Sequence, residues 1–187
     1  GHALCIVDTG GNHADLTPDY AAITAEMKSV AAFFGKNVLS ELSESDIYEN
    51  IAALRKKCGD RAILRAIHFF ADSKKAVQEA EALKNNDFET FKKLILSSGI
   101  SSSTCLQNVY STSNPQEQGL SLALALCQKI LGDKGAYRVH GGGFAGTIQA
   151  FVPTELLQTF HDEMESAFGE GNCHILSIRP VGGTEII

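Results

Sequence analysis

Tyr137-Arg-Val-His-Gly-Gly-Gly-Phe-Ala-Gly-Thr-Ile-Gln-Ala-Phe-Val152 is the most informative segment of the chain, because it places a run of glycines between two strand-like segments. Residues 136–140 and 147–152 carry the β-branched and aromatic side chains typical of strands. Glycine adopts positive φ at little cost and lets backbone N–H groups approach an anion closely. The stretch therefore predicts two strands joined by a loop suited to phosphate, with a tight turn of no further role as the alternative.

The glycine run differs from the two common nucleotide-binding loops. It does not open a helix, as Gly-x-Gly-x-x-Gly does, and it lacks the Lys-Ser/Thr pair of the phosphate-binding P-loop. Spacing alone therefore leaves both interpretations of the loop open.

The hydrophobic pattern outside this stretch predicts that helices fill the middle of the chain. Apolar residues recur every three to four positions there, and glycines, prolines or capping residues mark the ends of the segments. We expect helices over 17–34, 43–57, 60–84, 88–98, 116–131 and 153–168, and further strands over 3–8 and 173–178. Because the helices cluster and do not alternate regularly with the strands, this order is typical of an α+β fold.

Several local details of these helices are specific expectations. Thr17 and Asp60 are expected to cap the helices that follow them. The helix after Asp60 is expected to bury a stripe formed by Ile63, Ile67, Phe70 and Val77. Gly99 is expected to end the next helix, and Ser101–Thr104 and Ser111–Pro115 are predicted to be loops.

Composition and charge argue against several classes of protein. The chain has 187 residues with 44% hydrophobic content, which is enough for one domain or for one half of a larger protein. Its net charge of -6 argues against a nucleic-acid partner, since such proteins neutralise phosphates with clustered Lys and Arg. We expect no membrane association, because no stretch approaches the roughly 20 apolar residues that span a bilayer.

The cysteines indicate the cellular compartment of the protein, and the first residues suggest that the chain is a fragment. Its five cysteines are widely spaced and lack zinc-site spacing, so we interpret them as reduced thiols of a cytoplasmic protein. The chain opens at Gly1 directly before a strand-like segment, and we expect it to be a fragment of a longer protein.

The segment from Tyr137 to Val152 resembles the third signature of the GHMP kinases, which in galactokinases reads like Ser-Arg-Met-Thr-Gly-Gly-Gly-Phe-Gly-Gly-Cys. The matching positions are Arg138, Gly141, Gly142, Gly143, Phe144 and Gly146. His140 stands where Thr is usual, and Ala145 stands where Gly is usual.

Two earlier segments resemble galactokinases in the same order along the chain. In 12–20, His13 and Tyr20 are seven residues apart, as in the family. In 61–94, a helix is followed by an Asn-Asp-Phe turn and a second helix, which is similar to the family's helix, Gly-Asp-Tyr/Phe turn and helix. The resemblance thus extends over most of the chain.

The resemblance implies that residues 1–187 are a GHMP kinase C-terminal domain, with helices packed on a mainly antiparallel, ferredoxin-like sheet. An N-terminal lobe that binds ATP and sugar would then be missing and would be the partner of this domain. The family's Pro-x-x-x-Gly-Leu-Ser-Ser-Ala loop and its Gly-Glu-His-x-Asp-Tyr-like signature do not occur in the chain. We therefore expect no catalytic residue and no metal ligand here.

The resemblance also implies an activity for the whole protein. It would transfer the γ-phosphate of ATP, with Mg²⁺, to the anomeric hydroxyl of galactose and release galactose 1-phosphate. The chain alone would be inactive. The alternatives are a kinase for another sugar such as N-acetylgalactosamine, a non-catalytic sugar and nucleotide sensor, and a stand-alone interaction module.

Site residues follow from the same resemblance. Tyr20 would contact the sugar, because a phenol both donates and accepts hydrogen bonds, and packing at the first turn of a helix is its alternative role. The residues expected beside the nucleotide phosphates are Gly141, Gly142, Gly143, Phe144 and Gly146.

Other polar residues allow more than one role. Arg138 would bind phosphate or, as the favoured alternative, pair with a carboxylate. His140 would reach phosphates or only fill the place of the threonine. His13 and Asp15 could transfer protons, although local hydrogen bonding is the favoured role. As turn formers we expect Asp8 and Asn12, and as solvated helix faces Lys74, Lys75, Lys92 and Lys93.

Overall fold

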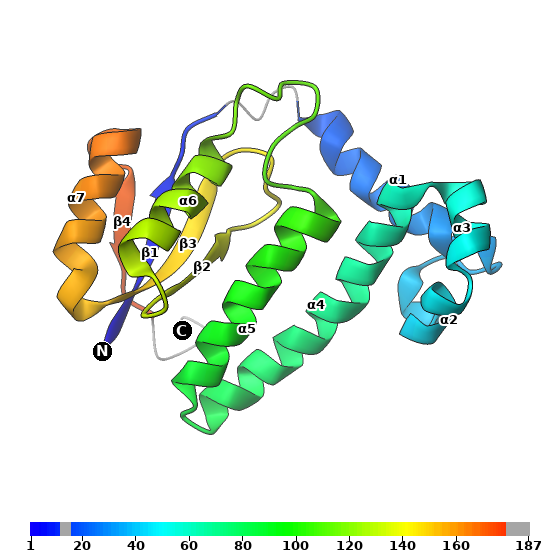
Figure 1. The fold of residues 1–187 in the computed structure, drawn as a ribbon, viewed down its shortest axis with the longest axis horizontal. Coiled ribbons are helices and arrows are strands. Elements are labelled where there is room, and N and C mark those ends of the chain that lie inside the picture. Colours follow the sequence, from blue (N-terminus) through cyan, green and yellow to red (C-terminus); the bar gives the residue numbers. More distant parts are fainter. Residues whose placement is uncertain (12–15, 179–187) are drawn as a thin grey trace, which may run out of the picture.

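Helices packed against a small antiparallel sheet make up the fold, which confirms the predicted α+β class (Figure 1). The computed structural model describes residues 1–11 and 16–178. The strands are β1 (His2–Asp8), β2 (Ala136–Val139), β3 (Thr147–Pro153) and β4 (Cys173–Leu176). The α-helices are α1 (Thr17–Phe33), α2 (Glu44–Glu49), α3 (Ile51–Cys58), α4 (Asp60–Lys84), α5 (Phe88–Ser101), α6 (Gly119–Leu131) and α7 (Leu157–Phe168).

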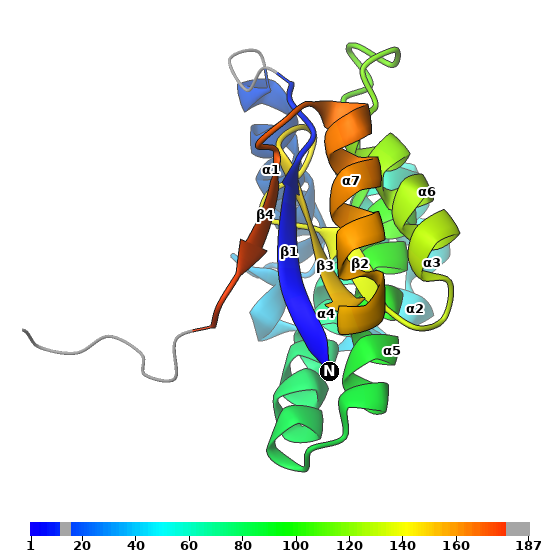
Figure 2. The same cartoon turned by 90° about the vertical axis from the view of Figure 1, so that its left-hand side faces the viewer.

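The four strands form one sheet in the order β2-β3-β1-β4, and every neighbouring pair is antiparallel. Alternate residues of β1 and β3 point to one face, where α6 and α7 cover them (Figure 2). Leu120, Cys127, Phe160 and Met164 from these helices complete that core. Strand β1 therefore lies between β3, which follows the glycine loop, and β4.

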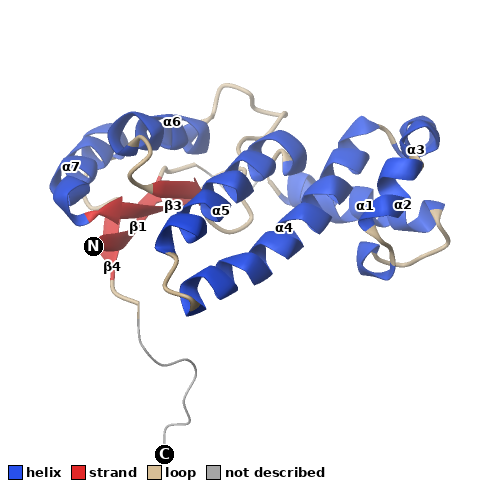
Figure 3. Ribbon diagram, turned by 60° about the horizontal axis from the view of Figure 1, so that its bottom comes forward, coloured by secondary structure: helices blue, strands red, loops and turns tan. Residues whose placement is uncertain are grey.

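The opposite face of the sheet is covered near β2 by α5, which pairs with the long helix α4 (Figure 3). Phe91 and Ile95 of α5 pack there against Ala136 of β2. The far half of α4 packs with α1, α2 and α3 around a separate core that includes Val30, Ile47, Leu54 and Ile63. In this way the start of α1 comes to the same end of the sheet as the glycine loop (Figure 1).

The prediction of one helix over 43–57 is wrong, because the chain forms α2 and α3 with a break at Asn50. The side-chain amide of Asn50 donates a 2.9 Å hydrogen bond to the Asp46 carbonyl oxygen. An asparagine that bonds the local backbone in this way competes with a continuous helix. The short helix α2 is stabilised at its start by a capping box between Ser43 and Asp46.

The two predicted helix caps are also wrong. Leu16 is the N-cap of α1, without a side-chain hydrogen bond, and Pro18 lies in the first turn. Gly59, at φ +85°, precedes α4, and the Asp60 carboxylate pairs with Arg55 at 2.7 Å instead of capping the helix. In the predicted stripe of α4, Val77 is 69% exposed, because this half of the helix packs toward α5 through Ala82.

The predicted loop at Ser101–Thr104 is helical, and Gly99 does not end α5. The helix continues to Ser101 and passes into a π-helical turn, Ser102–Leu106. Gly99 serves close packing, since a Cβ there would lie 3.0 Å from the Cβ of Arg138 and 3.1 Å from the carbonyl oxygen of Tyr137. The second predicted loop, Ser111–Pro115, is confirmed.

Two findings concern membranes and thiols. Within residues 1–11 and 16–178, no helix is both long enough and apolar enough to cross a bilayer. All five cysteines are free thiols, and Cys5, Cys127 and Cys173 are buried in the core between the sheet and the helices α6 and α7.

Candidate functional site

The loop between β2 and β3 has a backbone that needs glycine at several positions. Gly141, Gly143 and Gly146 have φ values of +74°, +81° and +90°, in the left-handed region. At Gly143 an added Cβ would lie 2.1 Å from the carbonyl oxygen of Asn108, and at Gly142 it would lie 2.8 Å from the Tyr20 ring. The glycines are therefore needed for both conformation and space.

Contacts from distant segments hold the carbonyl groups of this loop. The Tyr20 hydroxyl donates to the Gly143 oxygen at 2.7 Å, and the Asn108 amide donates to the Gly142 oxygen at 3.0 Å. At the end of the loop, the backbone N–H and the hydroxyl of Thr9 donate to the Gly146 oxygen at 2.8 and 2.7 Å. The loop is thus tied to the end of β1, to α1 and to the segment after α5.

Backbone N–H groups of the loop are left over for a ligand. Phe144 N–H donates to the Asn108 oxygen at 2.5 Å, and Gly146 N–H donates to the Gly10 oxygen at 3.3 Å. The remaining N–H groups donate to no other residue in the described part of the chain; they belong to Gly141, Gly142, Gly143 and Ala145. Backbone N–H groups without protein acceptors suit an anion such as phosphate.

Tyr20 lies against the loop from the first turns of α1. Its ring contacts the Phe144 ring edge to face, with the ring centroids 5.3 Å apart. Phe144 is buried and has a left-handed backbone conformation, with φ +63°. Burial, and secondarily the Asp19 carboxylate, raise the pKa of the Tyr20 phenol above its usual value. The hydroxyl therefore remains a protonated donor at neutral pH.

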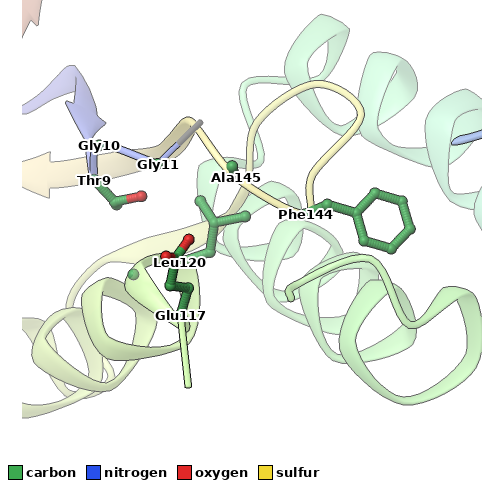
Figure 4. Close-up of a pocket in the computed structure, with 8 residues that line it drawn as sticks. Thr9, Gly10, Gly11, Glu117, Leu120, Phe144 and Ala145 are labelled. Carbon is green, nitrogen blue, oxygen red and sulfur yellow. The ribbon is translucent and has the colours of Figure 1, made fainter. Parts of the chain in front are cut away.

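Two cavities flank the loop. One of about 270 Å³ is lined by Tyr20, His140, Gly142 and Gly143 together with Asp8. The other, of about 390 Å³, lies between the loop, the end of β1 and the start of α6 (Figure 4). Figure 4 shows the Phe144 ring pointing away from Thr9 and Glu117 on the far wall. The first cavity joins the tyrosine and the glycine loop in one site.

Arg138 takes the favoured of its two predicted roles. Its guanidinium donates to the Ser98 hydroxyl and lies 3.8 Å from the Asp72 carboxylate. His140 lines the smaller cavity, and its Nδ1 lies 3.0 Å from the Thr147 hydroxyl. The fold places His140, but not Arg138, at the cavity beside the glycine loop.

Ser101 of α5 and His68 and Asp72 of α4 form a cluster between these two helices. His68 Nδ1 lies 2.9 Å from the Ser101 hydroxyl, and its Nε2 lies 3.8 Å from Asp72. Burial lowers the pKa of His68, with the Asp72 carboxylate opposing this effect. None of the three residues lines the two cavities beside the glycine loop, so we assign the group a structural role.

The expectation that Lys92 is solvated is wrong. Lys92 is 6% exposed and donates a 2.9 Å hydrogen bond to the Lys134 carbonyl oxygen, because α5 turns this side chain toward the end of α6. Lys74 does lie on a helix face exposed to solvent, where it pairs with Glu44.

The predictions for the N-terminal segment concern Asp8, Asn12, His13 and Asp15. Asn12, His13 and Asp15 lie outside the described residues. Asp8 is a turn former as predicted, because its carboxylate accepts a 2.9 Å hydrogen bond from the Gly10 N–H. Within the described residues, no group of three or more His, Cys, Asp or Glu side chains could hold a metal ion.

Sequence reasoning missed Asn108 and Thr9, which hold the glycine loop. Both lie in segments without helical or strand periodicity, and each contacts the loop only through the tertiary fold. The one signal in the sequence was an asparagine within the short apolar segment Leu106–Tyr110.

Comparisons of the sequence with known proteins find galactokinases. The chain is 27% identical over 158 residues to a galactokinase of Actinobacillus pleuropneumoniae, covering 84% of the chain and 39% of that protein. It is 29% identical over 164 residues to a galactokinase of Haemophilus influenzae, covering 88% of the chain and 39% of that protein. The chain thus spans about two fifths of the length of the curated relatives it matches. No protein-family model matches it.

Solved structures share the fold. A crystal structure of Lactococcus lactis galactokinase complexed with galactose superposes on 94% of the chain with a TM-score of 0.69 and 20% identity. A mevalonate kinase of L. major, in complex with R-mevalonate, superposes on 93% of the chain with a TM-score of 0.52 and 15% identity. In sequence the chain is similar to galactokinases over about two fifths of their length, and in fold it matches the galactokinase and the mevalonate kinase structures.

Proposed function

We propose that residues 1–187 are the C-terminal domain of a sugar kinase that transfers the γ-phosphate of ATP to the anomeric hydroxyl of galactose. Two observations support this function. The sequence similarity to galactokinases extends over more than four fifths of the chain. The observation that carries the proposal is the glycine loop, whose unused N–H groups lie beside Tyr20 at one cavity.

Each part of the loop has a role in this proposal. Gly141, Gly142 and Gly143 offer N–H groups to the phosphates of the nucleotide, since backbone dipoles at an unobstructed surface bind anions. Phe144 and Gly146 hold the shape of the loop through their contacts with Asn108 and Thr9. Tyr20 is the candidate sugar contact, at the border of the same cavity.

The rest of the catalytic machinery is proposed to lie in an N-terminal lobe. Phosphoryl transfer needs positioned phosphates, Mg²⁺ to neutralise their charge, and a group that orients the acceptor hydroxyl. We assign no catalytic residue and no magnesium ligand to the described residues. This domain would position the nucleotide phosphates and the sugar, and it would be inactive alone.

A coupled assay of ATP consumption tests the proposal. The full-length protein would be assayed with galactose and Mg²⁺, and with N-acetylgalactosamine and glucose as competing acceptors, beside the 187-residue chain. We expect turnover with galactose by the full-length protein and none by the chain. Preference for another sugar would move the proposal to that acceptor. If the full-length protein bound galactose without turnover, the result would favour a sensor over a kinase.

A further inference from the structure

Asn108 touches three consecutive residues of the glycine loop, although it lies more than thirty positions earlier in the chain. Its side-chain amide donates to the Gly142 oxygen at 3.0 Å, and its backbone oxygen accepts from Phe144 N–H at 2.5 Å. Between these two contacts, a Cβ added to Gly143 would lie only 2.1 Å from the Asn108 backbone oxygen. Asn108 is 1% exposed, so solvent does not compete for these hydrogen bonds.

The backbone places Asn108 in this position by an unusual route. The π-helical turn Ser102–Leu106 ends at Gln107, which has a left-handed conformation with φ +59°. Non-glycine residues pay for this conformation, and it persists where the surrounding structure requires it. Here it turns the chain so that the next residue faces the loop with both its backbone oxygen and its side chain.

The planarity of the peptide bond converts these contacts into a direction for each N–H group. In a trans peptide the carbonyl and the following N–H point in opposite directions. Asn108 holds the Gly142 carbonyl toward itself, so the Gly143 N–H of the same peptide points away from Asn108. The next peptide is fixed at both ends, by Tyr20 on the Gly143 oxygen and by Asn108 on the Phe144 N–H.

We propose that Asn108 is a positioning residue, whose side-chain amide fixes the Gly142–Gly143 peptide so that the Gly143 N–H faces the ligand. This inference rests on the proposed function for the identity of that ligand, the phosphates of a nucleotide. The orientation of the peptide itself is independent of that function. The side-chain amide is the part of the contact that mutation can remove, because the backbone oxygen is present in every variant.

The variant Asn108→Asp removes the donor while keeping the size of the side chain. A carboxylate facing the Gly142 oxygen repels it, whereas a protonated carboxyl group donates a hydrogen bond to it. In the full-length protein, we expect the kcat/KM for ATP to fall roughly tenfold or more at pH 8. The loss should shrink as the pH is lowered, since protonation restores a donor. Asn108→Ser, with a shorter donor, should lose activity without this pH-dependent recovery.

Asn50→Asp is the matched control, because the Asn50 amide also donates to a backbone carbonyl, at 2.9 Å, but lies between α2 and α3. We expect this variant to keep the pH profile of the unmodified protein. An Asn108→Asp variant with the same kcat/KM and pH profile as Asn50→Asp would overturn the proposal.

Hydrogen exchange on the unmodified full-length protein tests the orientation without any variant. The Phe144 amide should be protected, and the Gly143 amide should exchange fast until a non-hydrolysable ATP analogue is added. Protection of Gly143 in the free protein, with fast exchange at Phe144, would refute the assigned geometry. If the protein shows no kinase activity but has the expected exchange pattern, the proposed function fails while the positioning role of Asn108 stands.

Discussion

The Tyr20 hydroxyl donates a hydrogen bond of 2.7 Å to the carbonyl oxygen of Gly143, a residue 123 positions further along the chain. This bond joins the first turns of α1 to the glycine loop, and the Tyr20 ring also occupies the space beside Gly142. The candidate sugar contact and the candidate phosphate loop therefore support each other directly. A change in Tyr20 should alter the loop as well as the cavity that it lines.

Tyr20→Phe should weaken the loop and the candidate sugar contact together, because both depend on the hydroxyl. The ring contact with Phe144 remains, and the Gly143 oxygen loses its donor, so we expect about 1 kcal/mol of destabilisation. In the full-length protein, kcat/KM should fall about tenfold in the coupled ATP assay. Tyr48→Phe is the control, because Tyr48 is exposed on α2. Unchanged kinetics in Tyr20→Phe would show that the hydroxyl contributes nothing to the site.

Gly143→Ala should damage the loop far more than Gly141→Ala. Both glycines have positive φ, and an alanine in that region costs roughly 1 kcal/mol or more. Only at Gly143 does the new Cβ meet a fixed atom, the Asn108 oxygen at 2.1 Å, whereas it meets nothing within 4 Å at Gly141. Urea denaturation should rank the two variants in this order. Equal stabilities would mean that the close approach of Asn108 does not exist in solution.

The sequence predicted the order of strands and helices because that order depends on local patterns. Glycines at helix ends, as at Gly132, and alternation in strands are properties of short segments. Errors arose where the tertiary structure changed the role of a residue. The local pattern predicts that Gly99 ends a helix, but in the structure Gly99 allows α5 to lie against β2. Asp60 was read as a cap, but its carboxylate pairs with Arg55.

The site was predictable only in part, for the same reason. The glycine loop and Tyr20 were identified from a resemblance between segments, and the structure places them side by side. Asn108 could not be identified, because its role depends on a left-handed turn at Gln107 and on contacts with residues far along the chain. Local sequence contains neither.

Stability should fall at mildly acidic pH through His68. Burial lowers the pKa of His68 below its ordinary value of about 6.5, so the unfolded chain binds a proton that the folded chain excludes. The free energy of unfolding should therefore decrease as the pH is lowered from about 6.5 toward the lower folded pKa. His68→Gln should flatten this decrease in urea denaturations between pH 7 and pH 5. His174→Gln, on an exposed position of β4, should leave it unchanged, and a flat profile in the unmodified chain would contradict the prediction.

The five thiols should react at two distinct rates. Cys58 and Cys105 are partly exposed, whereas Cys5, Cys127 and Cys173 are buried in the core between the sheet and the helices α6 and α7. Burial raises the pKa of Cys127, and a hydrogen bond from its thiol to Cys173, followed by burial, raises that of Cys5. Because the thiolate is the nucleophile, iodoacetamide should modify Cys58 and Cys105 first. Peptide mapping by mass spectrometry would disprove this order if Cys127 reacted as fast as Cys105.

Glu26→Gln should be among the most destabilising single changes away from the loop. Arg65 is 2% exposed, and its guanidinium donates to the Glu26 carboxylate at 2.9 Å and to the Leu106 oxygen at 3.1 Å. Removing the carboxylate charge leaves a buried cation unpaired, which typically costs about 3 kcal/mol.

Two comparisons isolate this cause in urea denaturations. Arg65→Met should cost less than Glu26→Gln, because Glu26 keeps its pair with Arg61 when Arg65 is removed. Lys129→Ala breaks a surface pair with Glu163 and should change stability by no more than about 1 kcal/mol. A Glu26→Gln variant as stable as Lys129→Ala would show that Arg65 reaches solvent. The packing of α1 against α4 would then be looser than the burial of Arg65 indicates.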